Sequence, residues 1–258
     1  MDILTILGLV IAVVGVIGGM ILEGGHPGAL VQGTAFLIVI VGSLGATFVS
    51  LPASDLKLAI VALIKAFKPT KNDFHGVMEK ILELANLARR EGLLALESFT
   101  SGTDGHPFLR KCLTLAIDGS SADVIKETVE IDMMIAEEEA NAGAKFWETW
   151  GALCPTVGVL GAVLGLIHVM ENLDNPAMIG PGIAVAFVAT VYGVGYANVI
   201  CLPLSFKLKR FLQVDQLMRS MILDGVIGIQ SGAAPGALRS RLAVYQHDGG
   251  HKKDAAKH

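Results

Sequence analysis

The chain has 258 residues, of which 52% are hydrophobic and 17% are charged, and its formal net charge is −4. Soluble domains carry a charge on about a quarter of their residues, so this composition argues against a large soluble domain and favours a membrane protein. No basic cluster stands out except the short tail around Lys252 and Lys253, so nothing in the charge pattern indicates nucleic-acid binding.

Four apolar segments are long enough to cross a bilayer, whose hydrocarbon core of about 30 Å needs about 20 helical residues. They are Ile3–Leu22, Ala29–Leu51, Thr149–Met170 and roughly Ile179–Leu204. The first segment lacks the Lys or Arg that precedes the apolar part of a signal peptide, so we expect a retained span. Short polar turns join the first two segments and the last two, which predicts two helical hairpins.

The positions of lysine and arginine predict the orientation of these spans. Eleven of the 20 fall between Lys57 and Lys145, nine fall between Lys207 and Lys257, and the two hairpin turns have none. Cytoplasmic segments near span ends carry the excess of positive charge. We therefore expect both long polar segments, and both termini, in the cytoplasm.

The long segment between the second and third spans has the pattern of several helices. Apolar residues recur at helical spacing from Leu56 to Phe67, and Pro69 ends that pattern. A second apolar face follows Asp73 and is interrupted at Gly92. This segment therefore predicts a helical domain rather than an unstructured loop.

Further helices are expected after Pro107 and from Ser120, and the second of them can run through the glutamates at 137–139 into the third span. The C-terminal segment is expected to stay helical to about Val244 and to be disordered from Gln246. The sequence thus predicts an all-α integral membrane protein with four transmembrane helices, a large helical cytoplasmic loop and a helical C-terminal tail. Its expected domains are a transmembrane hairpin (1–52), a cytoplasmic helical domain (53–147), a pore-lining transmembrane hairpin (148–205) and a cytoplasmic C-terminal helix and tail (206–258).

The centres of the four spans contain no Asp, Glu, Lys or Arg. Membrane proteins that move cations usually place an ionisable group within their spans. If protons cross the membrane here, we therefore expect another chain to supply their main acceptor. His168, near the outer end of the third span, suits either proton handling or simple solvation at the interface.

Small residues recur four apart in the spans, as at Gly158 and Ala162, and predict close helix packing. This favours an oligomer over four helices that pack only on one another. Thr156 and Thr190 lie in Gly/Ala-rich surroundings that can face a partner helix, although a membrane threonine more often bonds a carbonyl of its own helix.

Pro155 and Pro203 lie at the cytoplasmic ends of the third and fourth spans. They either begin or end helices, or act as a pair of hinges, because a proline removes a backbone donor and bends a helix. Cys112, Cys154 and Cys201 form no CxxC pattern, so we expect neither a disulfide framework nor a metal site, and no cofactor.

Four runs of sequence stand out together: Met1–Gly8, Ala88–Glu97 (ARREGLLALE), Cys154–Leu166 (CPTVGVLGAVLGL) and Ala186–Gly193 (AFVATVYG). Together they resemble the MotA/PomA flagellar stator family. The similarity covers Met1 to about Tyr245, with the same order of spans and loops. Each motif alone is weak, whereas the combination is specific.

This resemblance implies a pentamer of the chain around a dimer of a single-span MotB-type partner in the bacterial inner membrane. That partner carries the ion-binding aspartate and anchors to peptidoglycan. The resemblance also assigns Arg89, Arg90 and Glu97 to contact with the rotor protein FliG, and it favours the hinge reading of both prolines.

The resemblance further places Thr190 on the ion pathway, and Thr156 is a candidate for the same pathway because of its Gly/Ala-rich surroundings. Sodium-driven members have threonine where Ala162 and Ala189 stand here. Sodium must exchange water oxygens for protein oxygens, whereas a proton needs only a carboxylate. The two alanines therefore favour proton coupling.

Two other classes stay open. An ExbB/TolQ-like energiser of outer-membrane transport resembles this chain around the pore helices but has three spans. A self-contained transporter requires its own midplane binding site, and none is visible in the spans. An enzyme is least expected, because the sequence shows no nucleophile–base set and no phosphate loop.

Overall fold

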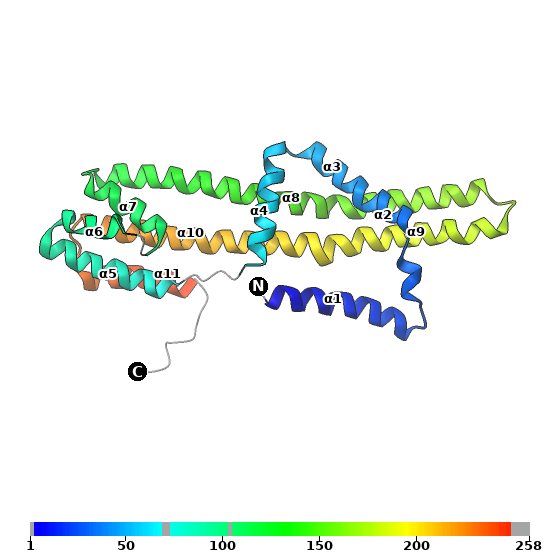
Figure 1. Cartoon of the computed structure of the whole chain (residues 1–258), viewed down its shortest axis with the longest axis horizontal. Coiled ribbons are helices and arrows are strands. Elements are labelled where there is room, and N and C mark those ends of the chain that lie inside the picture. The colour runs from blue at the N-terminus through cyan, green and yellow to red at the C-terminus, as the bar shows by residue number, and fades with distance from the viewer. Residues whose placement is uncertain (1–2, 69–72, 103–104, 249–258) are drawn as a thin grey trace. The chain divides into compact units, whose positions relative to one another are not determined.

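The computed structural model describes residues 3–68, 73–102 and 105–248. Every regular element within these ranges is a helix, and Figure 1 shows their course. The elements are α1 (Ile3–Leu22), η1 (Pro27–Leu30), α2 (Gly33–Phe36), η2 (Leu37–Val41), α3 (Gly42–Ser50), α4 (Ala53–Ala66), α5 (Phe74–Glu91), η3 (Leu93–Leu96), α6 (Glu97–Thr100), α7 (Pro107–Ile117), α8 (Ala122–Glu171), α9 (Pro176–Tyr196), η4 (Ala197–Cys201), α10 (Leu202–Gln230) and α11 (Pro235–Asp248). The expected all-α class is confirmed.

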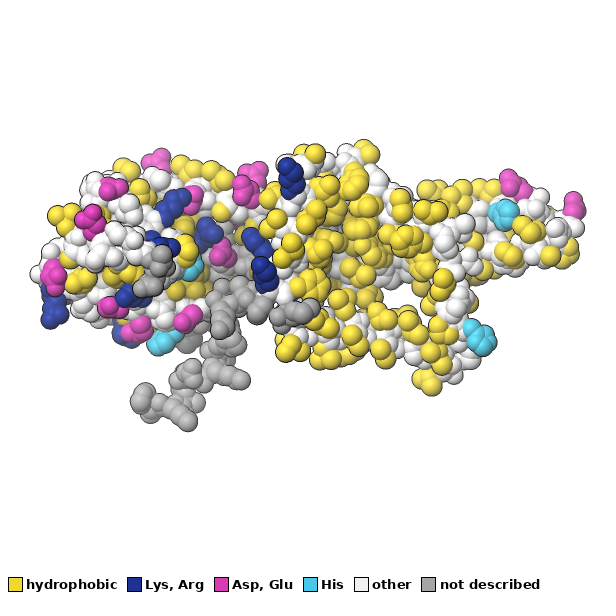
Figure 2. All heavy atoms as spheres, in the orientation of Figure 1, with side chains coloured by type: hydrophobic (Ala, Val, Ile, Leu, Met, Phe, Trp, Pro, Cys, Tyr) yellow, Lys and Arg dark blue, Asp and Glu magenta, His cyan; other side chains and the backbone are white. Residues whose placement is uncertain are grey.

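The chain divides into two compact units. Unit 1 comprises Met1–Pro69 and Glu139–Lys209, and unit 2 comprises Thr70–Glu138 and Arg210–His258. On the face drawn in Figure 2, hydrophobic side chains cover much of unit 1, while charged side chains gather on unit 2. Unit 1 thus has a surface suited to lipid, and unit 2 has a surface suited to water.

Four helical stretches are long and apolar enough to cross a membrane. The first is α1, the second is Gly33–Ser50, and the others lie within α8 and within Pro176–Gln230. The second begins at Gly33 rather than Ala29, because Pro27–Leu30 form a 3-10 turn. Helix α8 runs unbroken for 50 residues, so the expected continuation of a loop helix into the third span is confirmed.

Helices α8 and α9 approach each other closely along a seam of small residues. A Cβ added at Gly193 would lie 2.6 Å from the carbonyl oxygen of Cys154, and one added at Gly165 would lie 2.8 Å from the backbone nitrogen of Ala186. By contrast, a Cβ added at Gly15 or Gly19 of α1 would meet nothing within 4 Å. The glycine spacing therefore marks a packed seam on α8 and an open face on α1.

An aromatic and polar cluster joins α3, α8 and the end of α9 inside unit 1. The Trp150 indole N–H donates to Ser43 Oγ at 3.0 Å, and Cys154 Sγ lies 3.3 Å from the same oxygen. The ring of Tyr196 lies 4.9 Å from that of Trp150, and the ring of Phe146 lies 6.1 Å away. Ser43 is completely buried, so the indole provides the hydrogen bond that its hydroxyl needs in an apolar interior.

Two π-helical segments, η2 and η4, interrupt the second and fourth spans. Segment η4 ends at Cys201, two residues before Pro203. In a regular α-helix a proline ring clashes with the carbonyl group four residues earlier. A wider π turn directly before Pro203 gives that carbonyl more room.

Helix α4 packs through its alanines, although the helix was predicted from the spacing of its larger apolar residues. Ala59, Ala62 and Ala66 are buried, whereas Ile60 and Ile64 are exposed. The alanine face is close to α8, because a Cβ added at Gly143 would lie 2.9 Å from the Leu58 carbonyl oxygen. Small residues therefore line the packed face of α4, while Ile60, Val61 and Ile64 face outward and Leu63 is half-buried beside the alanines.

Unit 2 has a hydrophobic core of its own. Helix α11 packs against α5, and η3 and α6 connect α5 to α7. The side chains that are almost wholly buried in this core include Ile81, Leu96, Leu109, Leu113, Ile125, Met221, Ile222, Leu238 and Leu242. The apolar periodicity that predicted helices from Asp73 onward therefore corresponds to a real core.

Ion pairs tie α11 to the rest of unit 2. Arg239 binds Glu79 of α5 through two hydrogen bonds of 2.7 and 2.8 Å. This bond lowers the pKa of the Glu79 carboxyl. Asp224 accepts hydrogen bonds from Arg241 at 2.6 Å and from the Tyr245 hydroxyl at 2.8 Å. Burial of the Tyr245 hydroxyl, together with its bond to Asp224, raises the pKa of Tyr245 to about 12.

The C-terminal expectation was wrong in two respects. Helix α10 ends at Gln230, and a turn with Gly232 at a φ of +67° precedes Pro235 and α11. Helix α11 then continues to Asp248, so disorder does not begin at Gln246. The rest of the predicted disordered tail, 249–258, lies outside the described residues. The ion pairs of α11 to α5 and α10 explain why this segment is helical.

We expect Cys112 to resist thiol reagents in the folded protein. Its side chain is completely buried in the unit 2 core, and burial raises the pKa of the thiol to about 12. Because the thiolate is the reactive form, its population stays very small across pH 6–9 and raising the pH should not restore labelling. Maleimide labelling followed by peptide mapping checks this, with denatured protein as the positive control; rapid labelling of native protein would contradict it.

Candidate ion pathway and rotor-facing site

The two candidate pathway threonines lie on the exposed surfaces of α8 and α9. Thr156 Oγ1 donates to the Leu153 carbonyl oxygen at 2.8 Å, and Thr190 Oγ1 donates to the Ala186 carbonyl oxygen at 3.2 Å. Each hydroxyl proton is therefore used within its own helix, which leaves the oxygen lone pairs free to accept. Both surfaces are available to another chain, to lipid or to water.

The two alanines of the candidate pathway occupy different environments. Ala189 is completely buried, and its Cβ would lie 2.8 Å from a Cβ placed on Gly161. Ala162, the next residue on α8, is only half-buried. Ala189 is thus part of the α8–α9 seam, whereas Ala162 lies at its edge.

The two prolines are also placed differently. Pro155 is half-buried, and its Cα would lie 3.2 Å from a Cβ on Gly193, so it borders the α8–α9 seam. Pro203 is exposed at the start of α10, after the π-helical η4. Both lie inside continuous helical stretches, so neither is a simple helix end.

The three charged residues of the candidate rotor-facing site, Arg89, Arg90 and Glu97, are exposed on unit 2. Arg89 and Arg90 lie in the last turn of α5, where positive charge complements the helix dipole. Gly92, with a φ of +86°, ends α5 and is followed by η3 and then by Glu97. Within the described residues none of the three forms an ion pair, so their charges are available to a partner.

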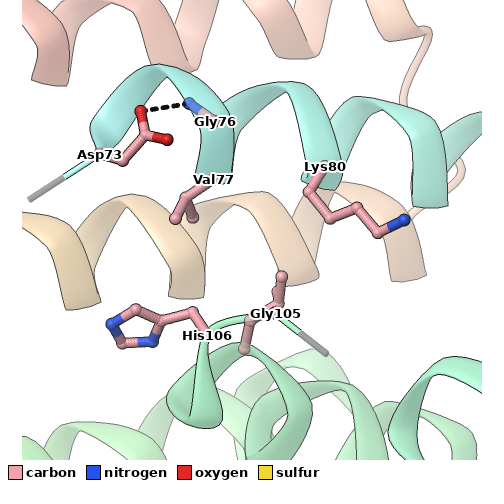
Figure 3. A pocket seen from close by; sticks show the side chains of 7 residues that line it. Asp73, Gly76, Val77, Lys80, Gly105 and His106 are labelled. Carbon is pink, nitrogen blue, oxygen red and sulfur yellow. Dashed lines mark hydrogen bonds between the residues drawn. The ribbon is translucent and has the colours of Figure 1, made fainter. Parts of the chain in front are cut away.

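A pocket of unit 2 lies between α5 and the start of α7 (Figure 3). Its polar side chains already have partners: Asp73 caps α5 by accepting from the Gly76 N–H at 2.8 Å, and Lys80 pairs with Glu83 at 2.9 Å. His106 Nδ1 accepts from the Phe108 N–H at 3.3 Å, and burial lowers the pKa of this histidine, which keeps it neutral at pH 7. These groups hold the fold of unit 2 together.

Comparison with known proteins decides the family. Residues 6–92 match a model for the N-terminal part of motility protein A, and residues 102–221 match one for the MotA/TolQ/ExbB proton channel family. Motility protein A of Bacillus subtilis is 35% identical over 246 residues, which are 95% of this chain and 91% of that protein. Motility protein A of Helicobacter pylori is 36% identical over 98% of both chains, and chemotaxis protein PomA of Vibrio alginolyticus is 33% identical over 96% and 97%.

The chain belongs to the MotA/PomA family of flagellar stator subunits.

Solved structures agree with this assignment to the MotA/PomA family. The C. jejuni MotAB structure matches with a TM-score of 0.91 at 34% identity, over 100% of this chain and 99% of that chain. The flagellar MotAB stator complex from Bacillus subtilis matches with a TM-score of 0.85, also at 34% identity, over 93% and 94%. These relatives favour the flagellar stator over the ExbB/TolQ-like alternative.

Sequence reasoning missed several polar contacts inside this MotA-type subunit. The Tyr192 hydroxyl donates to the Leu30 carbonyl oxygen at 2.5 Å and accepts from the Gln32 N–H at 3.4 Å, which ties α9 to the start of the second span. The Trp150–Ser43 bond was missed as well. The residue types gave a weak signal, because a Tyr or Trp in an apolar run needs a polar partner, but the sequence does not say which one.

Proposed function

We propose that this chain, together with a MotB-type single-span partner, forms a proton channel of a bacterial flagellar stator and converts proton flow into rotation of the rotor. The observation that carries this proposal is the α8–α9 pair, a close-packed wall of two apolar helices. The spans Thr149–Met170 and Ile179–Leu204 contain no Asp, Glu, Lys or Arg, and His168 is their single histidine. Such a wall has no carboxylate to accept a proton. The acceptor is then an aspartate of the partner.

The surfaces of unit 1 support assembly around that partner. No residue of α1 is buried, and large apolar side chains such as Val159, Val163 and Phe187 are exposed on α8 and α9. A pentamer of this chain around a partner dimer covers part of this surface with protein and leaves the rest to lipid. Neutralisation of the partner's aspartate then removes a charge from the pore, the helix contacts change, and the pentamer steps.

The driving force is large enough for mechanical work. Each elementary charge that crosses the membrane gains about 2.3 kcal/mol per 100 mV of potential. Thr156 and Thr190 offer oxygen lone pairs along the pathway, while Ala162 and Ala189 offer no oxygen ligand for sodium. We therefore assign the proton, rather than sodium, as the ion that drives this channel.

The proposed topology places the subunit in the inner membrane with both termini in the cytoplasm. Residues 1–52 and 148–205 form the two membrane hairpins, and residues 53–147 and 206–258 form the cytoplasmic parts. The charge distribution supports it, since all Lys and Arg lie in the two long segments. Pro155 and Pro203 lie where spans 3 and 4 meet these segments and act as the paired hinge.

Arg89, Arg90 and Glu97 form the proposed contact with the rotor protein FliG. All three are exposed and form no ion pair within the part of the chain that the structure describes. Opposite charges presented on one surface give a partner both orientation and register.

We expect Arg90→Glu to cost most of the motility that this chain restores to a strain lacking its own subunit. The substitution replaces attraction with repulsion at an unpaired exposed charge, and like charges facing each other cost several kcal/mol. Motility in soft agar and the torque on a tethered bead measure the effect. Lys80→Ala is the matched control, because Lys80 pairs with Glu83 within its own helix.

The ion assignment has its own measurement. Swimming speed of the complemented strain is expected to stay constant as sodium is replaced by potassium, and to fall when a protonophore collapses the proton gradient. Speed that follows sodium would overturn proton coupling. Failure of the wild-type chain to restore any motility, despite a normal amount in the membrane, would overturn the motor assignment.

A further inference from the structure

In η3, the 3-10 turn that follows α5, some side chains face the core of unit 2 and others face outward. Residues three apart in a 3-10 helix lie on the same face. In η3 the pair Leu93 and Leu96 faces the core of unit 2, with Leu96 completely buried. The next pair, Leu94 and Glu97, is therefore directed outward together.

Leu94 is unusually exposed for an apolar residue. Its side chain is 72% exposed, more than any other large hydrophobic residue described in unit 2. A single exposed leucine is ordinary on a protein surface. This one differs because it lies in η3, within the stretch of six residues between Arg90 and Glu97, two exposed charges without an ion pair in the described chain.

We propose that Leu94 is the apolar anchor of the rotor contact, inserted between the two charged residues into an apolar hollow on the rotor protein. This inference rests on the proposed function and adds to it. Exposed charges steer a partner and set its register, but they contribute little net affinity because water screens them. A buried apolar side chain at the centre of an interface, ringed by polar groups, contributes far more.

The occupant expected here follows from charge complementarity. It is a surface of the rotor protein on which an acidic side chain meets Arg90, a basic side chain meets Glu97, and a shallow apolar hollow between them receives the leucine. The turn presents this leucine rigidly, since Gly92 is held at a φ of +86° and Leu96 is anchored in the core. A rigid anchor loses little conformational freedom when it binds.

The test compares Leu94→Ser with Leu94→Met in the complemented strain, at equal amounts of chain in the membrane. Burying a leucine side chain corresponds to at least about tenfold in affinity, so Leu94→Ser should lower the stall torque on a tethered bead severalfold. Methionine keeps the apolar volume and should retain most of the torque. Val244→Ser is the matched control, because Val244 is 63% exposed on α11 of the same unit.

The outcomes separate this inference from the function on which it rests. If the wild-type chain restores motility and Arg90→Glu abolishes it, while Leu94→Ser behaves like Val244→Ser, only the anchor is overturned. If Leu94→Ser instead changes the size of the purified complex, Leu94 contacts another copy of the chain and the anchor is again overturned. If neither the wild-type chain nor any variant drives rotation, the motor function itself fails.

Discussion

Gly193→Ala should strongly destabilise the subunit, although it adds only one methyl group. The new Cβ would lie 2.6 Å from the Cys154 carbonyl oxygen and 3.0 Å from the Gly158 Cα. Both are backbone atoms of α8, so no side-chain rotation can relieve the overlap and the two helices must separate. Overpacking costs about 1–3 kcal/mol in ordinary cores and more where backbone is opposed. We expect a reduced amount in the membrane, a lower unfolding temperature in detergent and loss of motility.

Gly195→Ala is the control for this prediction. It lies on the same helix two residues later, and its added Cβ would meet nothing within 4 Å. Alanine favours a helix over glycine by about 1 kcal/mol, so this variant should be neutral or slightly more stable. Equal unfolding temperatures for the two variants would contradict the seam between α8 and α9.

Trp150→Ala is expected to have the second large effect on stability. The indole is nearly buried, contacts the rings of Tyr196, Phe146 and Trp147, and provides a hydrogen bond to buried Ser43. Removing a buried Trp typically costs about 3–5 kcal/mol, and here it also takes a partner from a hydroxyl. Thermal unfolding in detergent, followed by circular dichroism, measures the loss.

A double-mutant cycle isolates the hydrogen bond from the packing. Trp150→Phe keeps a ring but leaves the Ser43 hydroxyl without its indole donor, and Ser43→Ala leaves the indole N–H without an acceptor. The double variant removes both partners, so it should be less destabilised than the sum of the two single variants. Strict additivity would show that the bond does not contribute to stability.

The spans were predictable from sequence because lipid imposes a simple rule. A bilayer needs about 20 apolar helical residues, and no other regular element satisfies its backbone there except a closed barrel. The Ile3–Leu22 segment matches α1 residue for residue. The long helix α8 was also predictable, since no proline and a single glycine, Gly143, occur between Val124 and Phe146. Gly143 does not stop the helix and packs against α4.

Other features depend on contacts that sequence periodicity does not contain. The buried face of α4 consists of alanines, whereas the larger residues Ile60 and Ile64 dominate its hydrophobic pattern. The helix α11 reaches Asp248 because ion pairs, such as Arg239 with Glu79, hold it against α5. The partners in such contacts are 160 residues apart in the chain, so no local pattern reveals them.

The candidate site divides in the same way. Residue types and the family resemblance were enough to predict Arg90, Glu97 and Thr190 as site residues. All three are exposed in the structure, so a partner can reach them, and the experiments above test their roles. Sequence alone did not distinguish Ala189, which is buried against Gly161, from half-buried Ala162. A threonine at 189 would have to find room inside the seam, so the same substitution at the two positions would not have the same effect on packing.

Helix α1 has no buried residue, and although it contacts η1 and η4 and Thr5 accepts a hydrogen bond from Lys207, its placement depends strongly on its surroundings. Because lipid tails are as apolar as its own side chains, the hydrophobic effect gives it no reason to adhere to the other spans. In a detergent micelle without neighbouring subunits, its amide protons should exchange with solvent before those of α8 and α9. Lipid thickness would then affect how firmly α1 is held.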